Sequence, residues 1–436
     1  MLADLYSQHV RIQSARTDEA LAASGFDSLA IYAGRAPFYF LDDRPYPFTA
    51  NPHFKAWLPL GEASDCWLVH RPGRRPRLLF MQPRDYWHKP PCTPQAFWTE
   101  HFDIETIREP GEARAYLVNL PRCTFIGEWR EELSDWGFAA VNPEPLLNRL
   151  HYRRAIKTAY ELECMRRASA IAVRGHNAAL EAFRAGASEY EIHMSYVRAT
   201  ELTESELPYD SIVALNENAA VLHYQYKERQ APAERRSFLI DAGAQYHGYA
   251  ADITRTYSAA DDDEFAALIA RMEQAQQELC AGVKAGVDYA TLHLSAHVKI
   301  GNILRDAGII KVSGEEALNT GLSAVFFPHG LGHLLGIQVH DVGGFSVSPE
   351  GQRKSSPEGH PYLRLTRTLE PGFVVTIEPG LYFIETLLED ARARDYARHI
   401  DWKRVEQFRP YGGIRIEDDV VCTTGEPENL TRACAW

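Results

Sequence analysis

In residues 1–150 one stretch with helical periodicity is followed by several short apolar runs, and this order predicts a single α/β domain. The helical pattern ends before Gly25, and apolar runs of strand length occur at 28–32, 38–41, 66–69, 76–80 and 124–127. Loops rich in proline and aromatic residues separate these runs. Six of the eight tryptophans lie between Trp57 and Trp136, which indicates an aromatic core or an aromatic contact surface in this domain.

A change of pattern near residues 142–145, Asn-Pro-Glu-Pro, predicts a boundary, and we assign residues 151–436 to a second domain. Helical periodicity covers 157–183, 263–281 and 290–306, and Ser188 with Glu191 has the spacing of a capping box that starts another helix. Apolar runs at 211–215, 373–377 and 414–421 predict strands. The chain is therefore expected to have two domains and a mixed α/β fold of the α+β type.

Composition and charge narrow the range of functions. The 436 residues are 45% hydrophobic and 24% charged, as in ordinary globular proteins. A net charge of −13 without a basic tract argues against nucleic-acid binding. No signal peptide and no run of ~18 apolar residues is present, which argues against secretion and membrane insertion. Seven scattered cysteines without a CxxC pair indicate reduced thiols, so we expect a cytoplasmic protein.

Two aspartates stand where apolar strands end and begin. Asp241 closes residues 236–241, and the chain returns after a glycine-containing turn to Asp252. In one plausible hairpin register Asp241 lies opposite Asp252, and Gly243 lies opposite Ala250, which places the two carboxylates on one face. The alternative is that each aspartate only terminates a strand or caps a turn.

Three histidines and two further acids lie in the C-terminal third. His329, His333 and His340 fall within twelve residues, and the neighbouring glycines favour a turn or a close approach of the backbone. At least one of the three is expected to be functional, but their spacing does not say which. Glu378 closes an apolar strand, where a buried carboxylate needs a partner. Glu417 lies within the run 414–421, on the strand face opposite Ile414 and Ile416.

Arg415 shares one face of its strand with Glu417, so it can support a ligand or form a simple ion pair. Four acids bring enough negative charge to neutralise two divalent cations, and carboxylates can bridge ions roughly 3.5–4 Å apart. One imidazole among oxygen donors favours a hard ion such as manganese over a thiolate-type zinc site. Serine-nucleophile elbows, Walker loops and HExxH motifs are absent from the sequence. These patterns predict a two-metal hydrolase.

The order of these motifs resembles that of the pita-bread metallopeptidases, a family that includes methionine aminopeptidase, aminopeptidase P and prolidase. Within this family the chain is most like the bacterial Xaa-Pro dipeptidases, whose relatives include organophosphorus acid anhydrolases. The resemblance covers nearly the whole chain, and it is carried by the strings LIDAGAQYHGYAADITRTY, FFPHGLGHLLGIQVHDVGG, TIEPGLYF and GIRIEDD.

The resemblance implies an N-terminal α/β domain and a C-terminal pita-bread domain whose curved antiparallel sheet carries a dimetal site. It implies two Mn(II) ions per subunit, with Co(II) or Zn(II) as substitutes. Asp241 would bind one ion, His333 and Glu378 the other, and Asp252 and Glu417 would bridge both. A hydroxide held between the ions would attack the peptide carbonyl.

The resemblance also implies roles for residues around the metals. Glu378 would act as general base and then acid. His223 and His340 would line the site as catalytic residues, with His340 contacting the substrate and stabilising the tetrahedral intermediate. Arg364 would bind the substrate's C-terminal carboxylate, and Tyr209 would line the pocket.

Arg415 and His329 would support the metal ligands. The relatives are homodimers in which a loop, here around Asp42 and Asp43, borders the partner's site. The N-terminal domain would therefore serve dimerisation.

The predicted activity is hydrolysis of Xaa-Pro dipeptides. The nearest alternative is removal of the N-terminal residue from longer Xaa-Pro peptides, as in aminopeptidase P. Hydrolysis of organophosphate esters is a plausible secondary activity. Two further alternatives, a metal-free binding protein and a metal-free creatinase-type hydrolase of the same fold, would predict lost ligands, whereas all five ligand positions are kept.

Overall fold

The computed structural model describes residues 2–436, and these residues divide into two compact units. The first unit contains the described residues up to Cys164 together with Val347–Gln352. The second contains Met165–Ser346 and Arg353–Trp436. Both units combine helices with strands, so the mixed α/β class expected from the sequence is confirmed.

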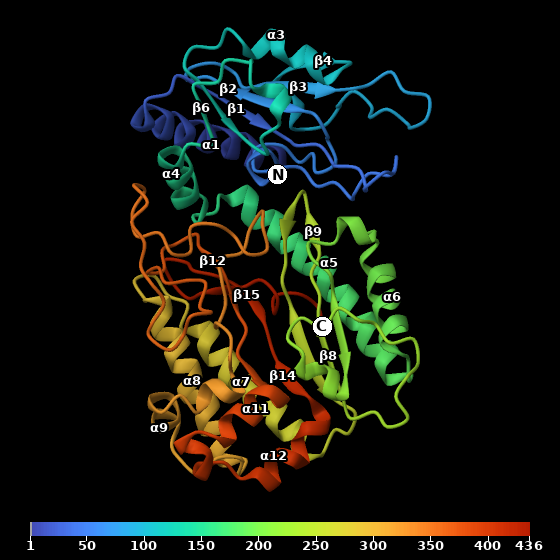
Figure 1. The fold of residues 1–436 in the computed structure, drawn as a ribbon, viewed down its shortest axis with the longest axis vertical. Helices are drawn as coiled ribbons and strands as arrows, with labels where there is room; N and C mark the ends of the chain where they lie inside the picture. The colour runs from blue at the N-terminus through green and yellow to red at the C-terminus, as the bar shows by residue number, and fades with distance from the viewer. Residues whose placement is uncertain (1) are drawn as a thin grey trace. The chain divides into compact units, whose positions relative to one another are not determined.

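A mixed six-stranded sheet of order β4-β3-β2-β1-β5-β6 forms the centre of the first unit. Its strand β1 pairs antiparallel with β2 and parallel with β5. Figure 1 shows helices α1 and α3 on opposite faces of this sheet. The elements are α1 (Leu2–Ser24), β1 (Ser28–Tyr32), α2 (Pro52–Lys55), β2 (Trp67–His70), β3 (Arg77–Met81), β4 (Asp103–Ile107), α3 (Arg114–Leu117), β5 (Cys123–Ile126), β6 (Ala140–Val141) and α4 (Glu144–Arg154).

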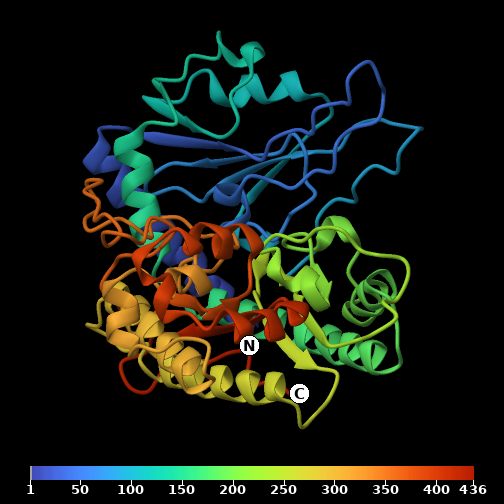
Figure 2. The ribbon, with the colours of Figure 1, turned by 60° about the horizontal axis from the view of Figure 1, so that its bottom comes forward.

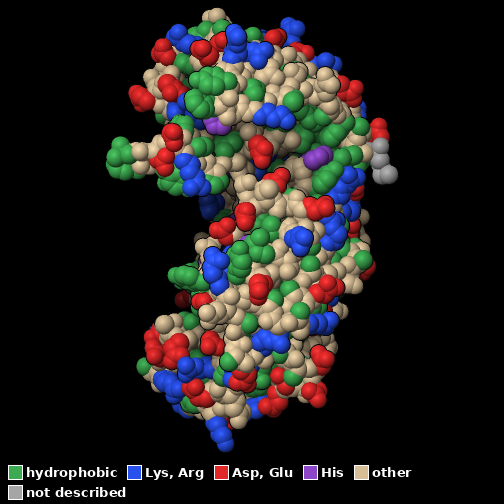
Figure 3. Space-filling view, turned by 90° about the vertical axis from the view of Figure 1, so that its right-hand side faces the viewer, with side chains coloured by type: hydrophobic (Ala, Val, Ile, Leu, Met, Phe, Trp, Pro, Cys, Tyr) green, Lys and Arg blue, Asp and Glu red, His purple; other side chains and the backbone are tan. Residues whose placement is uncertain are grey.

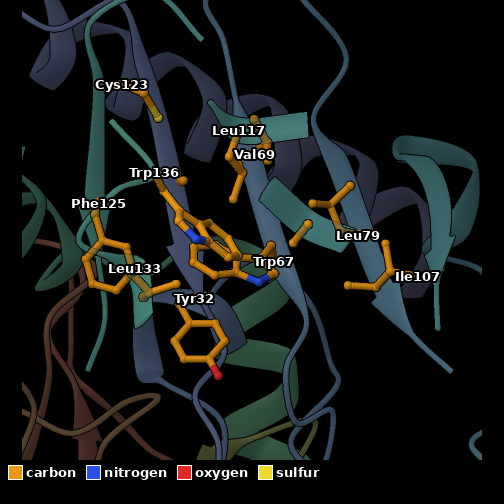
Figure 4. Packing of buried hydrophobic residues seen from close by; sticks show 12 residues of the cluster. Tyr32, Trp67, Val69, Leu79, Ile107, Leu117, Cys123, Phe125, Leu133 and Trp136 are labelled. Atoms are coloured by element: carbon orange, nitrogen blue, oxygen red, sulfur yellow. The ribbon is translucent and has the colours of Figure 1, made fainter. Parts of the chain in front are cut away.

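An aromatic cluster fills one face of this sheet, as the tryptophan distribution suggested. Trp67 stacks on Trp136 with ring centroids 5.5 Å apart, and Tyr32 packs beside Trp67 (Figure 4). Four of the six tryptophans in this unit are buried, whereas Trp87 and Trp129 are exposed. Most of these side chains therefore form a core rather than a contact surface.

One predicted strand in this unit was wrong. Residues 38–41 form no strand, and Phe38 makes only an isolated bridge to Pro45. Phe40 is 90% exposed and Leu41 is 91% exposed, so this apolar run lies on the surface. Apolar composition alone predicted a buried strand here, but no neighbouring strand is present to pair with it.

The second unit carries its strands in several small sheets between two groups of helices. Figures 1 and 2 show the strands between α5 and α6 on one side and α7 and α8 on the other. The elements are α5 (Ala159–Arg184), α6 (Glu189–Thr200), β7 (Ile212–Leu215), β8 (Ser237–Asp241), β9 (Gln245–Tyr246), β10 (Tyr249–Ala250), β11 (Thr254–Ser258), α7 (Glu264–Ala281), α8 (Tyr289–Asp306), α9 (Gly314–Asn319), α10 (Ser323–Phe326), β12 (Val374–Ile377), β13 (Gly380–Tyr382), α11 (Glu385–Arg392), α12 (Trp402–Phe408), β14 (Gly413–Arg415), β15 (Asp418–Val421) and β16 (Glu428–Asn429).

Local signals explain where several of these helices begin. The capping box expected at Ser188 and Glu191 is present at the start of α6 and is confirmed. Asp263 and Asp288 cap α7 and α8 through side-chain oxygens that accept backbone N–H groups. None of the described helices has both the length and the low charge that crossing a bilayer requires. Figure 3 shows acidic and basic side chains interspersed over one face of the molecule.

Candidate metal centre

Strands β8 and β11 bring the first two acids together. Asp241 is the last residue of β8, and Asp252 lies two residues before β11 begins. The predicted register was wrong by two residues, because Asp241 pairs with Thr254, and Ala250 pairs with Gln245. A shift of two keeps every side chain on its original face, so Asp241 and Asp252 become diagonal neighbours on one face.

The short hairpin of β9 and β10 explains this register. Tyr246 pairs with Tyr249, which leaves a two-residue turn at His247 and Gly248. Both turn residues have positive φ, 52° and 86°, as two-residue hairpin turns require. The turn therefore lies one residue further along the chain than the predicted register placed it, and His247 adopts a conformation that glycine or asparagine usually fills.

His333 and Glu378 are placed by β12. The backbone N–H of Thr376 in β12 donates to the carbonyl of His333 over 3.0 Å, and its hydroxyl accepts the N–H of His333 over 3.1 Å. The N–H of Glu378 donates to Leu331 O over 2.8 Å. A Cβ on Gly332 would lie 2.1 Å from Thr376 O. The glycine is therefore needed because the loop approaches β12 closely.

Glu417 lies between β14 and β15, where one continuous strand was predicted over 414–421. An isolated bridge joins Glu417 to Thr254, the residue that also pairs with Asp241. The Thr254 hydroxyl donates to Glu417 Oε2 over 2.6 Å. Glu417 is only 2% exposed, so its carboxylate enters the interior of the unit beside the two aspartates.

The five predicted ligand positions converge within this unit. Suitable ligand atoms of Asp252, His333 and Glu417 all lie within 4.8 Å of one another. His333 Nε2 lies 3.4 Å from Asp252 Oδ2 and 3.8 Å from Glu378 Oε1. Asp241 joins them from the end of β8. The arrangement gathers four carboxylates and one imidazole in a nearly solvent-free space.

Burial makes these charges costly without a cation. It raises the pKa of Glu378 to about 7 and raises the pKa values of Asp241 and Glu417, with neighbouring carboxylates adding to the effect. Burial also opposes ionisation of Asp252, but the hydrogen bond and charge of His333 outweigh it and lower the pKa of Asp252. The carboxylates of Asp252 and Glu378 likewise outweigh burial and raise the pKa of His333.

The donor set fits a pair of divalent cations. Asp241 Oδ1 is buried and has no hydrogen-bond partner among the described residues, which is the condition of an oxygen that awaits a ligand. His333 Nδ1 lies 3.0 Å from Leu334 O; when it donates there, the Nε2 lone pair remains for a metal. Arg415 forms an ion pair with the carboxylate of Asp241. Its single positive charge cannot neutralise the negative charges of four carboxylates.

Arg415 and His329 lie in one chain of hydrogen bonds. Arg415 donates to Asp241 Oδ2 over 2.7 Å, to Tyr382 OH over 2.8 Å and to Thr254 Oγ1 over 3.3 Å. Tyr382 OH lies 2.9 Å from His329 Nε2, and His329 Nδ1 lies 2.8 Å from Gly330 O. Burial lowers the pKa of His329 to about 3. A neutral His329 thus donates from Nδ1 and accepts from Tyr382.

The other predicted site residues lie nearer the surface of the unit. His340 packs edge-on against His333 with centroids 4.4 Å apart, and burial lowers its pKa to about 4. The charge of Arg364 adds to this lowering of the pKa of His340, and Arg364 and His223 are both exposed. Tyr209 donates its hydroxyl to Asp252 Oδ1 over 2.6 Å and so contacts a metal-ligand position directly.

Asp42 belongs to the first unit, where it is exposed. Its Oδ1 accepts the backbone N–H groups of Asp43 and Arg44 over 2.7 and 3.2 Å, which stabilises a turn. Its role at a partner's site, like the individual roles of the other site residues, stays a prediction.

Sequence reasoning missed three residues that bond to the predicted ligands or to the residues around them. Tyr382 joins Arg415 to His329, Thr254 binds Glu417, and Asp419 accepts the backbone N–H of Asp252 over 3.1 Å. Tyr382 lies four residues after Glu378, and Asp419 two after Glu417. Their proximity to the acids was the available signal, but their partners lie more than 30 residues away in sequence.

Comparison with known proteins follows the same division of the chain. Residues 163–424 match metallopeptidase family M24, and residues 4–152 match the family described as Xaa-Pro dipeptidase, N-terminal domain. An Xaa-Pro dipeptidase of Stenotrophomonas maltophilia is 54% identical over 429 residues, which cover 98% of this chain and 96% of that protein. One of Xanthomonas campestris pv. campestris is 55% identical over 432 residues, with 99% and 98% covered.

Solved structures show the same fold over almost the whole chain. Proline aminopeptidase P II from Yersinia pestis has a TM-score of 0.74 at 25% identity, covering 98% of this chain and 96% of that one. Escherichia coli aminopeptidase P with the inhibitor Pro-Leu has a TM-score of 0.75 at 24% identity, with 98% and 95% covered. The expected pita-bread architecture of the second unit is thereby confirmed.

Proposed function

Because the chain belongs to metallopeptidase family M24 and carries the N-terminal domain of Xaa-Pro dipeptidases, we propose that it hydrolyses Xaa-Pro dipeptides with divalent metal ions. The observation that carries this proposal is the buried set of four carboxylates around His333, in which Asp241 Oδ1 has no protein partner in the described chain. A cluster of this charge is stabilised by cations and by little else that a protein interior contains.

The ligand assignments follow from this geometry. Asp241, Asp252, His333, Glu378 and Glu417 would hold the two ions. Bound ions would polarise a carbonyl oxygen. They would also lower the pKa of a bound water, so that hydroxide is available at neutral pH. We propose manganese as the native ion because four of the five donors are carboxylates, with cobalt or zinc as substitutes.

Proton transfer is assigned to Glu378. It lies at the end of β12, its Oε1 is 3.8 Å from His333 Nε2, and its side chain is 17% exposed, so a substrate can reach it. We assign it the role of accepting the proton of the attacking water and passing it to the prolyl nitrogen, which has no N–H of its own. His340, neutral and packed on His333, would donate a hydrogen bond to the developing oxyanion.

Substrate length would be set by Arg364. Its guanidinium is exposed and lies near His340, so it can bind the carboxylate of a dipeptide whose scissile carbonyl is at the metals. His223 and Tyr209 would line the same space. An arginine that binds this carboxylate favours dipeptides over the longer substrates of aminopeptidase P.

Three further assignments complete the proposal. The enzyme would act as a homodimer, with the loop around Asp42 bordering the partner's site, and it would reside in the cytoplasm. Organophosphate ester hydrolysis would be a secondary activity of the same centre, since two-metal sites also cleave phosphate esters.

Hydrolysis of Ala-Pro and Gly-Pro-Ala by the manganese-loaded enzyme, measured side by side, tests the choice of substrate. The proposal predicts cleavage of Ala-Pro with little cleavage of Gly-Pro-Ala. Efficient cleavage of the tripeptide would instead assign the aminopeptidase P reaction. Failure to cleave either would contradict the peptidase assignment and direct attention to phosphotriesters.

A further inference from the structure

Three histidines of the second unit gather outside the candidate metal centre. His293 and His297 lie one turn apart on α8, and His360 lies in the loop that precedes Arg364. One nitrogen from each ring lies within 4.8 Å of those of the other two. Ring centroids are 4.7 Å apart for His293 with either partner and 4.5 Å apart for His297 and His360.

Two nitrogens of this histidine cluster are buried without a partner. His293 and His297 are each 1% exposed, and neither His293 Nδ1 nor His297 Nε2 has a hydrogen-bond partner in residues 2–436. Buried polar atoms are rarely left in this state. His297 Nδ1 lies 2.9 Å from Ser323 Oγ. When Nδ1–H donates to Ser323, the lone pair of Nε2 is left for another ligand, the arrangement found around metal-binding imidazoles.

We propose that His293, His297 and His360 bind one Zn²⁺ ion, or another transition-metal ion that prefers imidazole, at a site distinct from the five-ligand centre. Imidazole donors suit zinc, copper, nickel and iron, whereas manganese and magnesium prefer the carboxylates of the other site. Burial lowers the pKa of His293 to about 3 and of His297 to about 2, so both rings are neutral at pH 7. The neutral ring is the form that ligates.

One pair of ring nitrogens in the histidine cluster already lies close to the spacing of zinc ligands. His293 Nε2 and His360 Nδ1 are 2.9 Å apart, a hydrogen-bond distance. Tetrahedral zinc with bonds of about 2.0–2.1 Å places its nitrogen ligands about 3.4 Å apart. His360 is half-buried and loop-borne, so a movement of a few tenths of an ångström on its side brings this pair to that spacing. Three protein ligands leave a fourth position for water.

Phe327 packs between one histidine of the cluster and one histidine beside the candidate metal centre. Its ring centroid lies 4.7 Å from that of His297 and 4.8 Å from that of His329, so its ring lies against both. The three proposed zinc ligands and the five positions of the candidate metal centre have no residue in common. The bound ion would link α8 to the loop immediately before Arg364 and so restrict the movement of that loop. Within the loop, the N–H of Leu363 donates to His360 O over 3.3 Å.

Counting zinc ions per chain tests the proposal. The full-length wild type, His360→Ala and His293→Asn are equilibrated with the same excess of Zn²⁺, desalted and analysed by inductively coupled plasma mass spectrometry. His88→Ala is the matched control, because the His88 side chain is 84% exposed and His88 lies far in sequence from the histidine cluster. Circular dichroism identifies the variants that retain the native fold.

The wild type and His88→Ala are expected to hold one zinc ion per chain more than each folded variant of the histidine cluster. Zn²⁺ should also raise the melting temperature of the wild type more than that of His360→Ala. Equal zinc content in the wild type and the cluster variants would overturn the proposal, as would an equal loss in His88→Ala. Because ions are counted, the result does not depend on whether the chain cleaves Xaa-Pro dipeptides.

Discussion

Arg415 Nη2 donates to Asp241 Oδ2 across 2.7 Å, while the other carboxylate oxygen of Asp241 has no partner in the described chain. The guanidinium thus fixes the orientation of the Asp241 carboxylate. Arg415 is held in turn by Tyr382 and Thr254, so its position is set by strands on both sides of the site. These bonds support the proposal that Arg415 orients a metal ligand.

Replacing Arg415 with lysine should weaken metal binding while keeping the charge. Lysine has one donor group in place of the fork that reaches Asp241, Tyr382 and Thr254 together. Manganese affinity is expected to fall roughly 10–100-fold, measured by isothermal titration calorimetry. Arg166→Lys is the control, because Arg166 pairs with Glu428 near the surface. Unchanged affinity in the Arg415 variant would show that Asp241 needs no such support.

Gly332→Ala should disrupt the centre without touching a ligand. The added Cβ would lie 2.1 Å from Thr376 O and 2.5 Å from the hydroxyl of Tyr289, so the loop that carries His333 must move. The free energy of unfolding is expected to fall by roughly 3 kcal/mol, with loss of metal binding. Denaturant unfolding measures the first and metal analysis the second. Gly425→Ala, where the nearest atom is 4.0 Å away, should change neither; native stability in Gly332→Ala would contradict the account.

Arg364→Gln should raise KM for Ala-Pro far more than it lowers kcat. The guanidinium is assigned to the substrate's carboxylate and not to the reacting carbonyl, so its interaction is the same in the ground and transition states. Steady-state kinetics over a range of Ala-Pro concentrations separates the two constants. Arg353→Gln, an exposed arginine stacked on Phe345 in the preceding loop, is the control. An unchanged KM in the Arg364 variant would refute the assignment.

His176 should make the protein less stable in mild acid. It is fully buried, Nε2 is 2.9 Å from Ala242 O, and burial lowers its pKa to about 3. The unfolded chain takes up this proton near pH 6.5. Below that pH the unfolded state binds more protons, so stability falls; at pH 5 the loss is roughly 2 kcal/mol. Urea unfolding of the wild type and His176→Gln at pH 7 and pH 5 measures this effect. The free energy of unfolding should fall less in the variant, by this amount, when the pH is lowered. Equal decreases in the two proteins would argue against a buried neutral imidazole.

Local patterns predicted much of the fold because they are settled within a few residues. The capping box at Ser188 and Glu191 is such a case. The hairpin register was missed because the turn falls at His247 and Gly248, both with positive φ, and a histidine signals such a turn more weakly than asparagine or glycine does. The run at 38–41 was wrongly predicted as a strand because its apolar side chains are exposed and its backbone joins no sheet.

The candidate metal centre was approached through its acids, since carboxylates at the ends of apolar strands stand out in a sequence. The residues that hold those acids did not stand out. Tyr382 and Thr254 reach their partners only through the packing of separate strands. The histidine cluster was missed for a similar reason: His293 and His297 show helical spacing, but His360 follows 63 residues after His297 and meets them only in the folded chain.

The central claim is that two divalent ions on Asp241, Asp252, His333, Glu378 and Glu417 make this chain a dipeptidase. Titrating the chelated enzyme with Mn²⁺ while following Ala-Pro hydrolysis tests it most directly. Activity should be absent at the start and should rise to a plateau at two ions per chain. Full hydrolysis of Ala-Pro by the metal-free enzyme, or a plateau reached at one ion, would contradict the two-metal account.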